Sequence, residues 1–245
     1  MGPLLDLLDR HGSHGTFFVL DAVARTEPGL VRDIARRGHE VASHGYAHRH
    51  LAEQSAAAFR TGMADARDRL AELTGAAPLG FRAPYFSLTP KAAWVPEVLA
   101  ELGFAYSSSL LPARNPLAGW PGAPRDAFRW PSGLVELPVP VARTGMMTLP
   151  FLGGMYLRWL TPWRLGAMAR AWAEHGGVLW SYCHPYDLDT AGGAAQPPQA
   201  SALVQLMLWL NRGVTLPRLE GLLAGRQSVP FAARLREVDV PVWVP

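Results

Sequence analysis

The sequence has one cysteine, Cys183, and one lysine, Lys91, among its 245 residues. A single cysteine excludes an intramolecular disulfide and a zinc site made of several cysteines. The basic residues are therefore almost all arginines, which are dispersed along the chain, and the net charge is only +3. Nucleic-acid-binding proteins usually gather their basic residues in a run or on one face. The sequence therefore predicts no nucleic-acid partner.

Long apolar runs are also missing. The most apolar long segment, Met146–Trp163, is interrupted by Pro150, two glycines and Arg158, whereas a membrane-spanning helix needs about 20 mostly apolar residues. The first twelve residues lack the basic start of a signal peptide, and their short apolar stretch contains Asp6 and Asp9. These absences predict no membrane span and, for the chain as its sequence stands, a cytoplasmic location. Nothing in the sequence indicates an oligomeric state.

Two catalytic patterns are absent. No G-x-S-x-G segment is present, which argues against a serine hydrolase built on a nucleophile elbow. No glycine-rich phosphate turn follows the first predicted strand, which favours a barrel over an open doubly wound sheet. What remains is a chain with 49% hydrophobic and 18% charged residues, long enough for one α/β domain with a well-buried core.

Short β-rich runs alternate with helical patterns along the chain, which predicts parallel β/α units around a sheet or barrel. Expected strands are 16–20, 39–43, 79–82, 105–108, 134–139, 178–183 and an edge strand at 236–244. Expected helices are 4–10, 28–38, one from about residue 51 to 70, 91–102, one from residue 162, 202–211 and 216–224. Residues 111–133 are predicted to form a long loop and 192–198 a linker. We expect a main domain at 1–190 and a C-terminal helical extension, packed on it, at 191–245.

Two histidines follow the second predicted strand in the segment SHGYAH, residues 43–48. A helical turn would bring the imidazoles of His44 and His48 to one side, where they can share a divalent cation such as zinc. This spacing also arises by chance in a chain with eight histidines. In that case one histidine caps a helix and the other lies in solvent.

Two further polar segments follow predicted strands. In FRAPY, residues 81–85, Arg82 can orient a carboxylate through paired hydrogen bonds, and Pro84 can fix a loop that aims a backbone N–H near Tyr85 at a developing oxyanion. A strand exit with a surface arginine is the alternative. In YCHPYD, residues 182–187, His184 can protonate a leaving group because histidine titrates near neutral pH. Cys183 would point to the opposite face of that strand, so we expect it in the core.

The three segments share one position, the carboxyl end of a predicted parallel strand, which is where β/α barrels assemble active sites. In order and spacing, TFFVL (16–20), GHEVASH (38–44) with His48, RAPY (82–85) and the late His184 resemble the NodB-homology polysaccharide deacetylases, carbohydrate esterase family 4. The similarity covers roughly residues 4–190. ELP (136–138), GGMYLR (153–158) and HPYD (184–187) resemble a branch linked to bacterial exopolysaccharide and cell-surface glycan synthesis.

The resemblance implies an incomplete (β/α) barrel and a divalent metal, most commonly zinc, bound by His44 and His48. It implies that His184 is the general acid, that Arg82 holds the catalytic base, and that the backbone N–H of Tyr85 binds the oxyanion. The implied reaction removes N-acetyl groups from amino sugars of a bacterial polysaccharide or cell-surface glycan. A catalytically inactive glycan-binding relative and a deformylase of a lipid-linked amino sugar are the alternatives.

The family's first motif, an Asp-Asp pair at the end of the first barrel strand, is not found before the helix that begins near Leu4. We expect this strand to be lacking. One interpretation is that the natural protein begins further upstream, because a missing central strand leaves backbone edges unpaired. A second is a non-catalytic relative. A third makes Asp21 a substitute ligand, against the simpler role of capping the next helix.

Aromatic residues are concentrated in the predicted loop 111–133. Trp120 and Trp130 can stack on sugar rings there, or fill the loop as half-buried packing residues.

Overall fold

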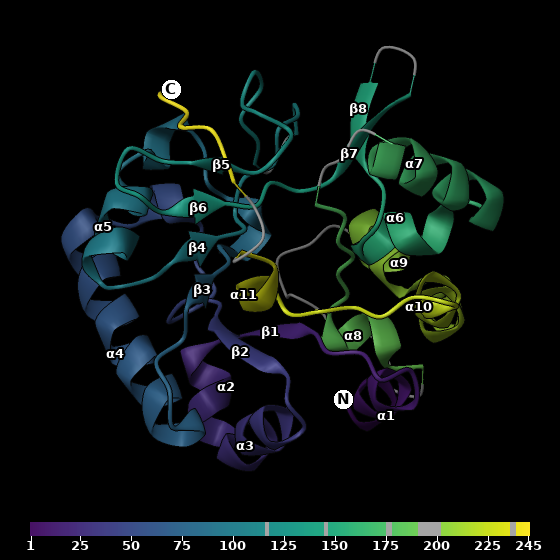
Figure 1. The fold of residues 1–245 in the computed structure, drawn as a ribbon, viewed down its shortest axis with the longest axis horizontal. Coiled ribbons are helices and arrows are strands. Elements are labelled where there is room, and N and C mark those ends of the chain that lie inside the picture. The colour runs from purple at the N-terminus through teal and green to yellow at the C-terminus, as the bar shows by residue number, and fades with distance from the viewer. Residues whose placement is uncertain (116–117, 145–146, 175–177, 191–201, 236–238) are drawn as a thin grey trace. The chain divides into compact units, whose positions relative to one another are not determined.

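A computed structural model describes residues 1–115, 118–144, 147–174, 178–190, 202–235 and 239–245 (Figure 1). The chain forms two compact units. We call His14–Val141 with Ser228–Pro245 the sheet unit, and Met1–Ser13 with Ala142–Gln227 the helical unit. Compact units need not fold independently, so the division into domains at 1–190 and 191–245 stays a prediction. The predicted linker at 192–198 lies outside the described residues.

The sheet unit is built on six strands in the order β1-β2-β3-β4-β6-β5. Neighbouring strands are parallel from β1 to β6, and β5 pairs with β6 in the antiparallel sense. The strands are β1 (Thr16–Val19), β2 (Glu40–Ser43), β3 (Gly80–Phe81), β4 (Tyr106–Ser107), β5 (Phe128–Arg129) and β6 (Val135–Glu136). The predicted α/β class with a mainly parallel sheet is therefore confirmed. Of the predicted C-terminal edge strand, residues 239–244 are described, and among them Val242 forms a parallel bridge with Arg129.

Helices follow the strands as the alternating pattern predicted, and α3 and α4 pack against β2. The sheet unit contains α2 (Asp21–Thr26), α3 (Pro28–Arg36), η1 (Leu51–Glu53), α4 (Ala56–Thr74), η2 (Pro84–Phe86), η3 (Pro90–Ala92), α5 (Val95–Glu101) and α11 (Phe231–Arg234). The apolar spacing in α4 is confirmed as a buried stripe of Phe59, Met63, Ala66 and Leu70. Its first turn is capped by the Ser55 hydroxyl, which accepts the Ala58 N–H.

The tryptophans of the predicted loop belong to the core of the sheet unit. Trp120 and Trp130 are buried, and their ring centroids lie 5.8 Å apart. Trp243 from the C-terminal segment packs edge-on against both rings. The packing interpretation of Trp120 and Trp130 is therefore confirmed, and β5 shows that part of the predicted loop is strand.

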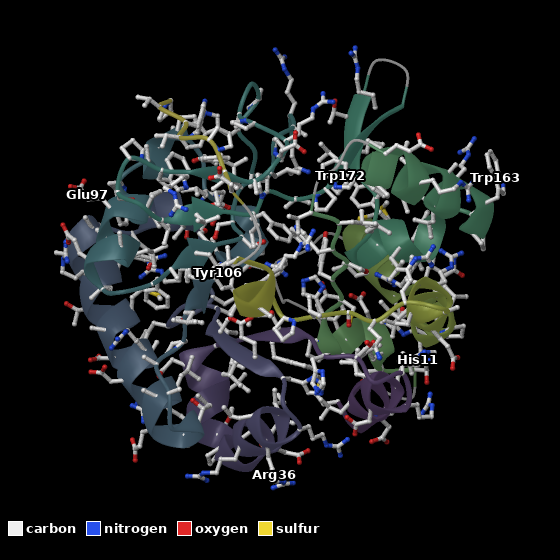
Figure 2. The ribbon with its side chains drawn as sticks, in the orientation of Figure 1. His11, Arg36, Glu97, Tyr106, Trp163 and Trp172 are labelled. Carbon is white, nitrogen blue, oxygen red and sulfur yellow. The ribbon has the colours of Figure 1, made fainter. Side chains whose placement is uncertain are left out.

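A close packing contact at Gly80 keeps β3 against β4. A Cβ added to Gly80 would overlap the ring of Tyr106, a fully buried residue that is labelled in Figure 2. The Tyr106 hydroxyl donates a hydrogen bond to Glu40 at 2.9 Å. We expect Gly80→Ala to lower the free energy of unfolding by about 1–3 kcal/mol, because overpacking forces neighbours to shift. Urea denaturation measures this. Gly29→Ala in α3 meets open space and is expected to stabilise by up to about 1 kcal/mol; equal stabilities for the two variants would contradict the argument.

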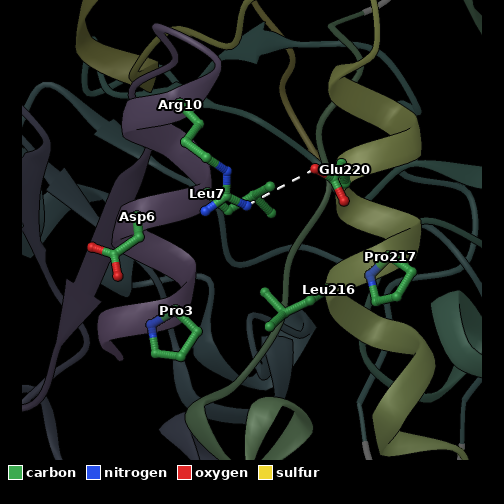
Figure 3. A pocket seen from close by; sticks show the side chains of 7 residues that line it. All are labelled: Pro3, Asp6, Leu7, Arg10, Leu216, Pro217 and Glu220. Atoms are coloured by element: carbon green, nitrogen blue, oxygen red, sulfur yellow. Dashed lines mark ion pairs between the residues drawn. The ribbon is translucent and has the colours of Figure 1, made fainter.

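The helical unit contains a two-stranded sheet, β7-β8, and an apolar cluster that includes Phe151, Leu157 and Trp172. Its elements are α1 (Gly2–Arg10), β7 (Val141–Thr144, which begins in the sheet unit), β8 (Met147–Pro150), α6 (Gly154–Trp159), α7 (Pro162–Glu174), α8 (Pro185–Leu188), α9 (Ala202–Trp209), η4 (Arg212–Val214) and α10 (Thr215–Leu223). A pocket of about 350 Å³ lies between α1 and α10 (Figure 3). Two of its three charged residues, Arg10 and Glu220, pair with each other at 3.9 Å, and the third is Asp6.

The predicted strand Val178–Cys183 does not form. These residues make a single bridge, between Tyr182 and Gly153, in which the Tyr182 N–H donates to Leu152 at 3.2 Å and the Gly154 N–H donates to Tyr182 at 3.1 Å. The apolar run is therefore paired at one point rather than inserted in the sheet. Separately, none of the described helices is long and apolar enough to cross a membrane.

Candidate active site

His44 directly follows β2 at the carboxyl end of the sheet. Its backbone N–H donates to Val19 at 2.8 Å, which continues the pairing of β2 with β1. Its Nδ1 lies 2.8 Å from the carbonyl oxygen of Arg82. A carbonyl can only accept, so Nδ1 carries the proton and the neutral ring has its lone pair on Nε2. This second contact is the arrangement that orients histidine ligands in metal sites.

His48 reaches His44 through a loop and not through a helix. Residues 44–50 form bends and irregular backbone, so the predicted helical turn is wrong. Gly45 turns the chain with a φ of +89°, and its N–H donates to the Ser43 hydroxyl at 3.2 Å. The two imidazole centroids nevertheless lie 5.2 Å apart. The predicted grouping of the two rings is therefore present, although the backbone that produces it differs.

Left-handed backbone is concentrated around these rings. Four described non-glycine residues have positive φ, and three of them, His48, Tyr85 and Phe86, belong to the two loops after β2 and β3. Each costs on the order of 1–3 kcal/mol, and such strain persists mainly where function needs a particular geometry. The ring of Tyr85 is 51% exposed and lies 4.8 Å from that of His48. The loops therefore meet at the histidine pair.

Arg82 follows β3 and is almost fully buried. Its backbone N–H donates to Ser43 at 2.9 Å, while Nε and Nη2 donate to the carbonyl and the hydroxyl of Ser108 at 3.2 and 3.0 Å. The guanidinium carbon also lies 4.1 Å from the ring centroid of Phe18. These contacts hold Arg82 at the carboxyl ends of β3 and β4. Its orientation of a catalytic base stays a prediction.

His184 belongs to the helical unit, where it precedes α8. Its predicted place at the end of a parallel strand is wrong, because that strand does not form. His184 is instead the N-cap of α8, and Asp187 Oδ2 accepts its backbone N–H at 2.9 Å and lies 3.1 Å from its Nδ1. The approach of His184 to the histidine pair of the sheet unit stays a prediction.

The comparisons with known proteins now bear on this geometry. Residues 2–107 match the family model "Polysaccharide deacetylase", and residues 108–236 match a domain of unknown function, DUF3473. Residues 2–107 therefore form a polysaccharide deacetylase domain. The predicted resemblance is thereby confirmed, and the two models together cover the elements that carry all the predicted site residues.

Several curated deacetylases share part of the sequence. A peptidoglycan-N-acetylglucosamine deacetylase of Bacillus cereus is 35% identical over 82 residues, which are 34% of this chain and 30% of that protein. A chitin deacetylase of Arthroderma benhamiae is 32% identical over 108 residues, 42% of this chain and 28% of that protein. The chain therefore spans about a third of the length of these relatives. A Mycobacterium smegmatis structure assigned to the polysaccharide deacetylases has a TM-score of 0.63 at 23% identity, over 100% of this chain and 80% of that one, which shows the fold.

A second layer of polar groups supports the Arg82 loop in this polysaccharide deacetylase domain. The Ala83 N–H donates to the Ser109 hydroxyl at 2.8 Å, and the Ser109 N–H donates to Glu136 at 2.6 Å. Glu136 also accepts the Leu110 N–H at 3.0 Å and is fully buried. The sequence analysis missed this support, although an acidic residue inside a strand of apolar neighbours was a signal for it.

Glu136 gives the protein a testable pH dependence. Burial raises the pKa of Glu136, and the N–H donors of Ser109 and Leu110 offset only part of that rise. The unfolded chain therefore loses this proton at lower pH than the folded one. The contribution of Glu136 to folding stability consequently falls as the pH rises above the ordinary pKa of a glutamate. We expect the unfolding free energy of Glu136→Gln, relative to the parent, to increase from about pH 4 to pH 7. Urea denaturation at each pH measures this difference in unfolding free energy. The control is Glu97→Gln, at an exposed carboxylate (Figure 2), for which the difference from the parent should change less with pH. Equal pH dependence in the two variants would contradict the argument.

Asp21 does not act as the substitute ligand considered above. Its carboxylate is buried and pairs with Arg25 Nε at 2.5 Å and with Arg69 Nε at 2.8 Å, one oxygen to each. The capping interpretation is also wrong, because Leu20 is the N-cap of α2 and Asp21 is its first residue. Asp21 instead ties α2 to α4, and its N–H donates to Gly45 at 3.0 Å.

Two neighbouring imidazoles in the described part of the chain are suited to bind a metal ion. His44 and His48 offer imidazole nitrogens, which suit zinc and related divalent cations. Within the described ranges, no group of three or more His, Cys, Asp or Glu side chains is placed to hold a metal ion. The pair therefore fits as two ligands of a larger set.

Proposed function

We propose that this protein hydrolyses N-acetyl groups on amino sugars of a bacterial polysaccharide or cell-surface glycan. The observation that carries the proposal is the meeting of His44, His48 and Tyr85, in two strained loops, at the carboxyl ends of β2 and β3. The named relatives, which act on peptidoglycan and chitin by their descriptions, support an acetylated amino-sugar substrate.

His44 and His48 would hold a divalent cation, and two imidazole donors favour zinc. When bound, such a cation supplies Lewis-acid polarisation of the substrate carbonyl. The carbonyl of Arg82 keeps the proton of His44 on Nδ1. This contact holds the ring with its other nitrogen available as a ligand.

The remaining residues handle charge and protons. The backbone N–H of Tyr85 would donate to the oxyanion that forms when water adds to the acetyl carbonyl. Arg82 would orient the carboxylate that removes the proton of that water. His184 Nε2 would give a proton to the amine nitrogen as the C–N bond breaks. The acyl carbon leaves with the hydroxyl as acetate, and the sugar keeps a free amine.

Acetate release from acetylated glucosamine oligomers tests the proposal, with the purified protein freed of metal and then supplied with zinc or cobalt. Release that requires the added cation is the expected result. If formate were released from an N-formylated sugar and no acetate from the acetylated one, the proposed activity would be deformylation instead of deacetylation. Oligomer binding with neither product would overturn hydrolysis and indicate a glycan-binding relative.

A further inference from the structure

A buried arginine lies behind His184 in the helical unit. Arg158, on α6, is only 1% exposed, and its Nη2 forms an ion pair with Asp187 Oδ1 at 3.1 Å. Its Nη1 donates to the carbonyls of Leu208 and Leu210 at 2.9 and 2.6 Å. A buried charge is costly unless it is paired and hydrogen-bonded. Arg158 is therefore held by hydrogen bonds to the C-terminal end of α9 and by an ion pair with Asp187, in which Nη2 and Oδ1 are close but do not align as a hydrogen bond.

Asp187 contacts Arg158 and His184 with different oxygens. Oδ1 faces Arg158, while Oδ2 accepts the His184 N–H at 2.9 Å and lies 3.1 Å from the imidazole Nδ1. Burial by itself raises the pKa of Asp187, but the hydrogen bonds from His184 and the charge of Arg158 outweigh it, so the pKa is lowered. The group is then a carboxylate at neutral pH, and its Oδ2 accepts a hydrogen bond from the Nδ1–H of the ring.

Aromatic rings complete the surroundings of His184. The ring of Tyr186 stacks on the imidazole at 4.6 Å with an interplanar angle of 10°, and Tyr182 meets it edge-on at 5.8 Å. The His184 side chain is still 39% exposed. The buried side of the ring therefore carries Nδ1 and its carboxylate partner, which makes Nε2 the nitrogen suited to exchange a proton with a ligand.

We propose that Arg158 is a positioning residue that acts through Asp187: it holds the carboxylate so that His184 keeps its proton on Nδ1 and uses Nε2 for proton transfer. The inference rests on the proposed role of His184 as the general acid. Among the described residues, the polar contacts of Arg158 are with Asp187, Leu208 and Leu210, so it would act on His184 through Asp187. Its contacts with Leu208 and Leu210 make the C-terminal helices part of the support of the acid.

Kinetics of three variants test this role. Arg158→Met and Asp187→Asn are each expected to lower kcat about 10- to 100-fold, the loss typical of a misplaced catalytic group, with little change in KM. Because Arg158 acts through Asp187, the double variant should lose no more than Asp187→Asn alone. Losses that multiply would overturn the proposal. Arg158→Lys, which keeps the charge, should recover part of the activity.

The matched control is Arg218→Met. Arg218, on α10, donates to the carbonyl of Leu157, the residue before Arg158. The substitution therefore removes a hydrogen bond from a guanidinium to a backbone carbonyl in the same part of the helical unit. We expect its kcat within about twofold of the parent, since a single contact of this kind chiefly affects stability. An equal loss of kcat in Arg218→Met and Arg158→Met would indicate a nonspecific destabilisation of the helical unit, and would overturn a specific role of Arg158.

A second readout does not depend on activity. In protein labelled with ¹⁵N-histidine, the neutral ring of His184 is expected to carry its proton on Nδ1 in the parent and to shift toward the other tautomer in Asp187→Asn and Arg158→Met. The His184 signal is assigned by its loss in His184→Gln. An unchanged tautomer in both variants would overturn the inference. A shifted tautomer in a protein that releases no acetate would leave it standing and contradict only the proposed function.

Discussion

Replacing His184 by glutamine is expected to lower kcat for acetate release on the order of 10²- to 10⁴-fold, the usual contribution of a general acid. Glutamine provides a polar side chain of similar size, but its amide cannot transfer a proton. KM and zinc affinity should stay close to the parent values, because His184 is proposed to act on the leaving amine and not on the metal. Initial rates of acetate release and a zinc titration measure the three quantities.

The neighbouring thiol provides the control. Burial, together with the charge of Asp187, raises the pKa of Cys183 to about 12. The group is therefore a neutral thiol at neutral pH and a poor nucleophile. Cys183→Ala should retain kcat within a few-fold of the parent. If His184→Gln were as active as Cys183→Ala, the general acid would have to be another group.

The second large effect is expected at the histidine pair. His44→Ala or His48→Ala should weaken zinc binding by more than about 100-fold, because loss of a supporting group alone costs 10- to 100-fold and these variants remove a direct ligand. Acetate release should fall with the bound metal. Isothermal titration of the metal-free protein with zinc measures the affinity without any reliance on activity.

His50→Ala is the matched histidine control. His50 lies two residues beyond His48, and its Nδ1 accepts the Ala52 N–H at 3.2 Å as the cap of η1. Its removal is expected to cost about 1 kcal/mol of stability while zinc affinity stays unchanged. If His50→Ala weakened zinc binding as much as His44→Ala, the proposed ligand pair would be wrong.

Much of the sheet unit could be predicted because its signals are local. The buried stripe of α4 follows from apolar spacing, and β1 and β2 follow from short apolar runs that end before helix starts. Parallel strands in sequence order place their carboxyl ends together, which is why His44 and Arg82 were expected at one edge of the sheet. In the structure they are joined by the contact from Nδ1 to the carbonyl.

Local patterns failed where the outcome depended on distant partners. The run at 178–183 has the composition of a buried strand, yet it pairs only at Tyr182, with Gly153. The loop at 44–48 was predicted as a helical turn, because periodicity alone does not reveal the positive φ of Gly45 and His48. Strand formation requires a free neighbouring edge, and a loop conformation is set by the residues it packs against.

The sequence by itself determined the α/β class, the family and the residue types of the candidate site, because strand order and short motifs are written along the chain. Only the tertiary structure decided how those residues are supported. Arg158 lies 29 positions before Asp187, and Ser109 lies 27 positions before Glu136, yet each pair is in direct contact. Such pairs form because burying a charge without a partner costs free energy. That cost arises only in the folded chain, where these side chains are removed from water.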